Sequence, residues 1–298
     1  MKALRVIGWA IAVLLALIGL LAAGAHLLSQ RKYERRLDIK AAPVAYVSTP
    51  EAIERGKYLF ESRGCGECHG GNGAGRVFAD DGKSLKLKSP NITRGPGGVV
   101  ASYTEVDWVR AIRHGVKPDG RPLLVMPCED YNRLTDADLA ALVAYTRQLP
   151  PVEGTAAEFK LPLIFKALYV AGAVKDAPER IDHSLPPAKP VAEAVNVEHG
   201  AYVANMCIGC HGAKLTGGKI PGGPPDWPAA ADLTAGSAVM KSYDSADRLK
   251  TMFRTGKAPG GRALQVMPFP SLKQMSDTDV EALYLYLKAL PPRPAGAG

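Results

Sequence analysis

The sequence predicts an all-α protein in which one membrane-spanning helix precedes two tandem helical domains of the same construction. Residues 6–28 form an uncharged apolar stretch that is long enough to cross a bilayer as a helix. The remainder of the chain repeats itself at an offset of about 141 residues, which indicates two copies of one folding unit. Apolar residues at helical spacing recur at matching places in both copies.

Composition and charge restrict the class of protein. Of the 298 residues, 22% are charged and 47% are hydrophobic, as in globular domains and unlike disordered or collagen-like chains. A single apolar stretch of spanning length excludes a polytopic membrane protein. Residues 1–50 hold seven Lys/Arg against two Asp/Glu, which accounts for most of the net charge of +8. Because this excess flanks the apolar stretch, it indicates a membrane-proximal segment and not a nucleic-acid partner.

The N-terminal segment has two interpretations. Its apolar core is longer than the 7–15 residues that are usual for a cleaved secretory signal, which favours an uncleaved anchor. Residues 23–25 (AGA) fit a cleavage site, so a removed signal is the alternative. We expect residues 1–30 to form the transmembrane anchor and residues 31–50 to form a polar linker.

Four of the five cysteines form two identical signatures, CGECH at 65–69 and CIGCH at 207–211. The C-x-x-C-H motif is the covalent attachment site of c-type haem. On a helix, the two cysteines lie one turn apart on one face, where their thiols can add to two porphyrin vinyl groups. The following histidine shares that face and can bind the iron. We therefore predict two haem c groups, attached through Cys65, Cys68, Cys207 and Cys210 and ligated by His69 and His211.

A zinc site, a redox dithiol and a disulfide are the alternatives for each cysteine pair. Zinc requires four nitrogen or sulfur ligands, and neither signature has a second pair nearby. A thioredoxin-like dithiol needs a βαβ context, which the sequence does not show. Two identical signatures, each with the same downstream partner, favour haem.

That downstream partner is a methionine followed by proline. Met126 lies 57 residues after His69, and Met267 lies 56 residues after His211. A thioether is a soft, neutral ligand that favours ferrous iron and raises the reduction potential. The proline lacks an N–H and fixes φ, which suits a rigid loop. Core packing is the usual role of a single methionine, but the matched positions predict Met126 and Met267 as the second axial ligands.

Two other side chains compete with Met126 in the first half. His114 is a possible iron ligand, although the second half has Thr255 at the matching position. Cys128 lies two residues after Met126, and as a thiolate ligand it would lower the potential and change the chemistry. The simpler interpretation of Cys128 is a small, partly buried thiol.

The repeat extends well beyond the ligands and predicts two domains, residues 51–151 and 193–293, each with its own core and haem. Both copies end in Leu-Pro-Pro. Four arginines either neutralise haem propionates or lie solvated at the surface. Residues at matching distances from the two methionines include Arg113 and Arg254, Gly115 and Gly256, Arg121 and Arg262, Asp136 and Asp277, and Tyr145 and Tyr286.

Local signals predict the helices of the first domain at about 50–62, 104–114 and 135–149, with the haem signature after the first of them. Gly115 suits the left-handed residue that ends a helix. We expect glycine- and proline-rich loops between the signature and the middle helix, at 70–75, 96–98 and 221–225. Capping boxes are predicted at Thr104/Asp107, Thr135/Asp138 and, in the second domain, Ser276/Asp279.

The segment between the repeats, residues 152–192, is predicted as an inter-domain linker with a short apolar helix. Residues 161–174 are apolar but too short to span a bilayer. A helix packed across the two domains is the favoured interpretation. A surface patch for a partner or for the membrane interface is the alternative.

This pattern resembles the class I cytochrome c domain, twice over. More narrowly, it is similar to the membrane-anchored c-type cytochrome subunits of bacterial periplasmic dehydrogenases. The resemblance implies an all-α fold around a low-spin haem in each domain. Many of those subunits carry three haems, whereas this chain has two signatures. The segments that carry the resemblance are 91–93 (NIT), 113–115 (RHG), 118–121 (PDGR) and 126–127 (MP), and then 220–222 (IPG), 232–234 (DLT), 254–256 (RTG) and 267–268 (MP).

We therefore predict a dihaem cytochrome c without enzymatic activity that carries single electrons between a donor and an acceptor protein. A dehydrogenase subunit or a terminal oxidase is the expected kind of partner. Covalent haem attachment in bacteria takes place outside the cytoplasmic membrane, so both domains are expected on the periplasmic side of a single-pass inner-membrane protein. The alternative is a dihaem enzyme of the peroxidase or thiosulfate-oxidising type, in which Cys128 supplies an unusual ligand at the first haem.

Overall fold

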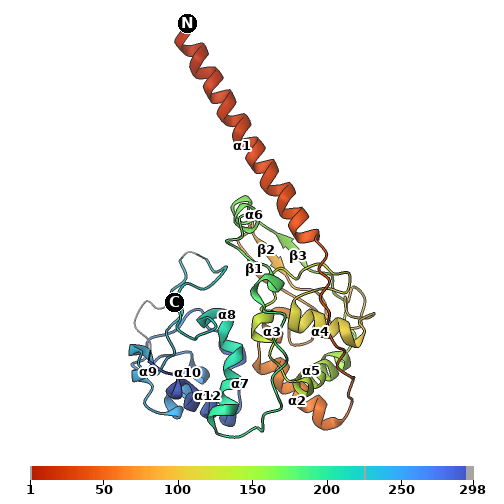
Figure 1. Cartoon of the computed structure of the whole chain (residues 1–298), viewed down its shortest axis with the longest axis vertical. Coiled ribbons are helices and arrows are strands. Elements are labelled where there is room, and N and C mark those ends of the chain that lie inside the picture. Colours follow the sequence, from red (N-terminus) through yellow and green to blue (C-terminus); the bar gives the residue numbers. More distant parts are fainter. Residues whose placement is uncertain (1, 225, 293–298) are drawn as a thin grey trace.

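The structure is a computed structural model that describes residues 2–224 and 226–292, and it is mostly helical, as predicted (Figure 1). Helix α1 (Lys2–Glu34) projects away from a body formed by two helical domains that lie side by side. None of its most apolar window is buried, and the helix is long and apolar enough to cross a membrane. The predicted loop residue Pro225 and the predicted domain end at residue 293 lie outside the described residues.

The first domain contains the three predicted helices and a helical haem signature. Thr49, at the N-cap, accepts a hydrogen bond from the backbone of the first helix, and Gly115 ends the second in the left-handed conformation at φ 66°. Local capping and apolar spacing therefore place these helices, and buried Leu59, Phe60 and Leu139 form their shared core. The elements are α2 (Pro50–Ser62), α3 (Cys65–His69), α4 (Glu105–His114), η1 (Cys128–Asp130) and α5 (Asp136–Gln148).

The second domain repeats this order around a core of its own, which includes Met240, Met275 and Leu283. Its haem signature is divided, because Cys207 ends a 3-10 turn and the remaining residues form a short α-helix. The elements are α7 (Val197–Val203), η3 (Ala204–Cys207), α8 (Ile208–His211), α9 (Ala238–Ser242), α10 (Ala246–Thr255), α11 (Phe269–Leu272) and α12 (Asp277–Ala289).

In each domain a glycine lets the first and last helices approach closely. A Cβ on Gly56 of α2 would lie 1.9 Å from the carbonyl oxygen of Ala141 in α5. A Cβ on Gly200 of α7 would lie 2.0 Å from the carbonyl oxygen of Ala282 in α12. Both contacts involve backbone atoms, so no side-chain movement could relieve them. The two glycines thus set the same helix crossing in both halves of the molecule.

A small antiparallel sheet departs from the all-helical prediction. Strands β1 (Val77–Asp80) and β2 (Lys86–Lys88) lie in the segment predicted as loop, and β2 also pairs with β3 (Glu158–Lys160) from the linker. Strands of three or four residues carry too little alternation to be recognised in a sequence. The pairing of β2 with β3 joins segments about 70 residues apart, with Leu87 opposite Phe159.

The linker helix α6 (Leu163–Val170) lies against α1, which corrects the favoured prediction of a helix packed across both domains. The linker continues through the turn η2 (Ala177–Arg180), which contacts η1 of the first domain. The linker thereby joins the base of the N-terminal helix to the first domain.

Candidate haem sites at the domain interface

The first signature forms one helical turn directly after Gly64, which adopts a left-handed conformation at φ 84°. Cys65 and Cys68 are free thiols one turn apart. Burial raises the pKa of Cys65 to about 12, and the neighbouring Cys68 adds to that shift. His69 Nδ1 lies 3.1 Å from the carbonyl oxygen of Pro90. A carbonyl only accepts, so Nδ1 carries the proton and Nε2 keeps a free lone pair.

The second signature repeats this arrangement. His211 Nδ1 lies 2.8 Å from the carbonyl oxygen of Ala231, which again leaves Nε2 as the free ring nitrogen. Cys207 and Cys210 are free thiols, and burial together with the nearby charge of Asp130 raises the pKa of Cys207 to about 12. Burial also lowers the pKa of His211, which keeps its imidazole neutral near pH 7.

Both histidines fit a haem iron. Metal-binding histidines usually donate their second ring N–H to a carbonyl or carboxylate, which fixes the tautomer and the ring orientation. His69 and His211 each make that bond to a carbonyl 20 or 21 residues further along the chain. Within residues 2–224 and 226–292, no group of three or more His, Cys, Asp or Glu side chains could hold a bare metal ion. One histidine of fixed tautomer beside each pair of thiols is a donor set that suits the iron of an attached porphyrin.

The two methionine loops have the same backbone geometry. Pro127 has φ −79° and ψ 63°, and Pro268 has φ −77° and ψ 67°. The backbone N–H two residues after each methionine donates to its carbonyl at 2.9 Å, in Met126 and in Met267 alike. Each methionine side chain is partly buried against the core of its own domain. The sequence repeat is therefore also a geometric repeat, and ligation by these two sulfurs stays a prediction.

The two rival ligands of the first half have other partners. The Cys128 thiol is fully buried and donates to the carbonyl oxygen of Ala111 at 3.3 Å. Burial raises the pKa of Cys128 well above its usual value, so the side chain is a neutral thiol. His114 Nδ1 lies 3.0 Å from Nδ1 of His183 in the linker. These contacts agree with the simpler interpretation of Cys128 and give His114 a structural role.

Two of the four matched arginines hold the start of the last helix in their domains. Arg113 Nη2 donates to the carbonyl oxygen of Leu134 at 2.6 Å, and Arg254 Nη2 donates to that of Met275 at 2.7 Å. Each also pairs with the first acidic residue of the helix, Asp136 or Asp277. These two arginines are structural, and neither is simply solvated. Of the other pair, Arg121 forms an exposed ion pair with Asp119, and Arg262 is exposed.

Each haem signature contacts the opposite domain. Ser271 Oγ of α11 donates to Glu67 Oε1 of α3 at 2.9 Å. The backbone N–H of Gly209 in α8 donates to Asp130 Oδ1 of η1 at 2.7 Å. Ser271 and Asp130 occupy matching positions, four residues after the two methionines. The interface is thus approximately twofold, and it brings the two attachment segments together.

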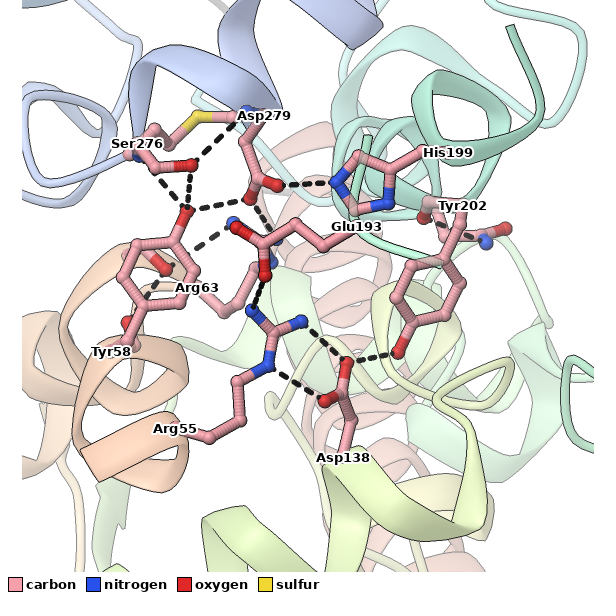
Figure 2. A network of polar contacts seen from close by, with 12 residues as sticks. Arg55, Tyr58, Arg63, Asp138, Glu193, His199, Tyr202, Ser276 and Asp279 are labelled. Atoms are coloured by element: carbon pink, nitrogen blue, oxygen red, sulfur yellow. Dashed lines mark hydrogen bonds and ion pairs between the residues drawn. The ribbon is translucent and has the colours of Figure 1, made fainter. Parts of the chain in front are cut away.

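A polar network links the domains with the same symmetry (Figure 2). Tyr58 of α2 donates to Asp279 of α12 at 2.6 Å, and Tyr202 of α7 donates to Asp138 of α5 at 2.6 Å. Each tyrosine also accepts a hydrogen bond from the backbone N–H at the cap of the facing helix, Ser276 at 3.0 Å and Thr135 at 3.3 Å. These contacts were not predicted, although each tyrosine lies two residues after a helix-crossing glycine, Gly56 or Gly200, and this shared spacing is their signal in the sequence.

This network corrects two predicted capping boxes. Thr135 and Ser276 do cap their helices, since each side chain accepts from the backbone N–H of Asp138 or Asp279. The carboxylates of those two aspartates point to the interface and do not return to the cap. A tyrosine hydroxyl from the other domain receives the N-cap N–H that the carboxylate was predicted to receive. Only the box at Thr104 and Asp107 forms as predicted, at 2.9 Å.

The two aspartates differ in their basic partners. Asp279 pairs with Arg63 of the first domain at 2.6 Å and with His199 at 2.7 Å, and its side chain is completely buried. Asp138 pairs with Arg55 of its own domain at 2.8 Å. Burial alone would raise the pKa of Asp279. The charge of Arg63 and hydrogen bonds from Tyr58, Arg63 and His199 outweigh burial and lower that pKa to about 2.

Comparison with known families agrees with the repeat. Residues 51–145 match the family described as cytochrome C oxidase, cbb3-type, subunit III, and residues 197–291 match the family described as cytochrome c. Residues 51–145 and 197–291 are therefore two cytochrome c domains, a class of helical domain that implies haem c. The predicted class of domain is confirmed in both copies.

Three curated relatives are similar along most of the chain. The fructose dehydrogenase cytochrome subunit of Gluconobacter japonicus is 27% identical over 81% of this chain and 53% of that protein. The cytochrome c subunit of alcohol dehydrogenase (quinone) from Gluconobacter oxydans (strain 621H) is 27% identical, with coverages of 82% and 56%. The gluconate 2-dehydrogenase cytochrome c subunit of Pantoea cypripedii is 26% identical, with coverages of 80% and 59%. The chain is homologous to cytochrome c subunits of bacterial quinone dehydrogenases, and it spans little more than half of their length.

Proposed function

We propose that this chain is a membrane-tethered dihaem cytochrome c that carries single electrons as the cytochrome subunit of a dehydrogenase complex. Haem c supplies reversible one-electron exchange between ferric and ferrous iron. In this proposal Cys65, Cys68, Cys207 and Cys210 attach the two groups, and His69, Met126, His211 and Met267 are the axial ligands. With both axial positions filled by protein, the chain acts as a carrier and the partner subunit performs substrate chemistry.

The observation that carries this proposal is the matched pair of imidazoles. Each has Nδ1 tied to a backbone carbonyl, at 3.1 Å for His69 and 2.8 Å for His211. The bond orients the ring, selects the Nε2 lone pair and makes the imidazole more basic as a ligand. The carbonyl oxygens of Pro90 and Ala231 thus hold both imidazoles in the same tautomer, with Nε2 unprotonated, inside domains of the cytochrome c class.

Contacts between the signatures and the opposite domain support electron exchange within one molecule. The bonds from Ser271 to Glu67 and from Gly209 to Asp130 keep both attachment segments at one interface. We infer that a donor and an acceptor can use different domains of the same chain. The apolar helix α1 supports a single-pass inner-membrane anchor. Covalent haem attachment, which takes place outside the cytoplasmic membrane in bacteria, supports a periplasmic position for both domains.

Leucine substitutions of the two methionines test the ligand assignment. Met126→Leu and Met267→Leu remove the thioether but keep most of the side-chain volume. We expect each variant to lower the reduction potential of one haem and to remove its methionine–iron absorption signature. Met240→Leu, in the core of the second domain, is the matched control and leaves both haems unchanged.

Cys128→Ser separates the carrier from the alternative enzyme with an unusual ligand. The buried thiol donates to Ala111, and we expect the substitution to leave the haem spectrum unchanged. If Cys128→Ser alters the spectrum of the first haem and Met126→Leu does not, the carrier assignment is wrong for that haem.

Purification of the protein from detergent-solubilised membranes tests the proposed partner. We expect a dehydrogenase to co-purify, and a cytochrome that purifies alone contradicts a stable complex.

A further inference from the structure

Helix α6 exposes apolar side chains on the outside of the molecule. Leu163 is 48% exposed, Ile164 is 66% exposed and Leu168 is 41% exposed. Ile164 and Leu168 are four residues apart and therefore lie on one face of the helix, with Leu163 beside them. The following turn, residues 171–173, adds exposed small residues (AGA). Such a cluster on a helix of eight residues needs a partner to cover it.

The contacts between α6 and α1 define the level of this apolar cluster along the axis of α1. Lys166 Nζ lies 3.0 Å from His26 Nδ1, and Lys32 Nζ donates to the carbonyl oxygen of Tyr169 at 2.8 Å. Residue numbers therefore rise in the same direction along both helices. Leu163 is three residues before Lys166, or about 4.5 Å at the helical rise, and so lies at the level of residue 23 of α1. That level is inside the uncharged stretch 6–28.

A buried ionic clamp fixes α6 to the base of α1. Arg35 donates to both carboxylate oxygens of Asp176, at 2.6 and 2.9 Å, and the Asp176 side chain is completely buried. Tyr169, the buried residue of α6, donates to the same carboxylate at 2.5 Å. Lys32 also pairs with Glu179 at 3.0 Å. Because both helices share this clamp, α6 keeps its height relative to α1.

We propose that α6 is a membrane-interface foot, in which Leu163, Ile164 and Leu168 insert into the headgroup and upper acyl region of the bilayer that α1 crosses. The inference rests on the proposed anchoring by α1. Five residues, or about 7.5 Å along α1, separate residue 23 from the end of the uncharged stretch at residue 28, so the first turn of α6 would enter the bilayer beside α1 to about that depth. A second point of attachment beside α1 limits the tilt of the haem domains over the membrane.

Charge favours lipid as the occupant of this face. The helix itself carries no acidic residue, and its one charged residue is Lys166. Exposed Arg31 of α1 and exposed Lys175 of the linker lie in the segments that flank the clamp. Basic side chains at the edge of an apolar face suit anionic lipid headgroups. Continuity with the apolar surface of α1 supports the same occupant.

Fluorescence quenching in vesicles tests the foot with the full-length haem-loaded protein. An environment-sensitive fluorescent amino acid is incorporated at position 164, at position 20 in α1, or at position 239 in α9. Val239 is an exposed apolar residue of the second domain and serves as the matched control. Each protein is reconstituted into vesicles of phosphatidylethanolamine and phosphatidylglycerol, with and without acyl-chain nitroxide lipid. An unchanged haem absorption spectrum verifies that each labelled protein is folded.

We expect nitroxide lipid to quench the probes at positions 20 and 164, with blue-shifted emission at both, and to leave the probe at 239 unchanged. Quenching at 20 without quenching at 164 overturns the foot and leaves the anchor intact, which frees the face of α6 for a protein partner. Absence of quenching at both 20 and 164 overturns the proposed membrane anchoring and the foot together.

Discussion

The two domains share one backbone plan but stabilise their common interface differently. In the first domain, Asp138 is held by Arg55 from the same domain, and that arginine is partly exposed and also pairs with Glu193. In the second domain, Asp279 is completely buried and is held by Arg63 from across the interface. The repeat thus sets the twofold arrangement, whereas individual side chains decide which half carries a buried ion pair.

The asymmetry has a simple origin in the sequence. Arg63 lies two residues before the first signature, and the matching residue of the second copy is Asn205. Asn205 donates to the backbone of Tyr202 in its own domain. A single position of the repeat therefore places a buried ion pair, Arg63 with Asp279, across the interface in one half, whereas the pair between Arg55 and Glu193 is partly exposed. Removing one partner of such a pair costs more than removing an exposed one, because the other charge remains buried.

Substitution of the two interface aspartates should give the largest difference in stability between the two halves of the interface. We expect Asp279→Ala to lower the free energy of unfolding by roughly 3–5 kcal/mol, since it leaves Arg63 buried without a counter-charge. We expect Asp138→Ala to cost about 1–2 kcal/mol, because Arg55 keeps Glu193 and access to solvent. Denaturant unfolding monitored by haem absorption measures both values. Equal losses would contradict the asymmetric account of the interface.

The helix-crossing glycines should behave identically in the two domains. A methyl group at either position meets a backbone oxygen within about 2 Å, so we expect Gly56→Ala and Gly200→Ala each to destabilise its domain by roughly 2–3 kcal/mol. Gly19→Ala is the control, because open space surrounds that helical glycine and alanine favours a helix. Thermal unfolding compares the three variants. A stabilising effect at position 56 or 200 would refute the close crossing.

Acid should weaken the contacts that Asp279 makes across the interface. The pKa of Asp279 is about 2 in the folded protein, against 3.8 as its ordinary value. A depressed carboxyl pKa contributes stability that is fully present above pH 4 and is lost as the pH falls towards 2. This group should contribute about 2 kcal/mol of that loss. The slope of stability against pH in this window should be shallower in Asp279→Asn than in the wild type, and an unchanged slope would contradict the assignment.

Substitution of the two interface tyrosines should have the smallest effect on stability, and the effect should be the same at both positions. Tyr58→Phe and Tyr202→Phe each remove one hydroxyl that bonds an aspartate at 2.6 Å and receives a cap N–H. We expect each to cost about 1 kcal/mol, with the two values agreeing within error. Tyr145→Phe, in the last helix of the first domain, is a matched control. A cost at only one of the two interface positions would show that the twofold contacts are unequal.

Local features of the fold were predictable from the sequence, and long-range ones were not. Apolar spacing and caps within ten residues placed α2, α4 and α5 almost to the residue. The three-stranded sheet was missed because strands as short as 86–88 and 158–160 carry little periodic signal. Helix α6 was predicted to pack across both domains, whereas its contacts with Lys32 and His26 show that it lies along α1.

In the candidate haem sites, too, the local features were predictable from the sequence and the long-range contacts were not. Each C-x-x-C-H motif is a local pattern, so its residues could be named from the sequence and its helical form anticipated. The carbonyl partners Pro90 and Ala231 lie 20 or 21 residues away in irregular loops, where no pattern identifies them. Asp138 and Asp279 were assigned to caps because capping is a local rule. Their tyrosine partners come from the other domain, which a local rule does not consider.

Intact-mass measurement of the denatured protein, produced in a host that matures c-type cytochromes, counts the haem groups attached to the chain. We expect the mass to exceed that of the polypeptide by two haem groups. We also expect Cys65→Ser/Cys68→Ser and Cys207→Ser/Cys210→Ser each to lose one of them. A mass equal to that of the amino acids alone, or one that neither double variant changes, would contradict the claim that each signature attaches its own haem.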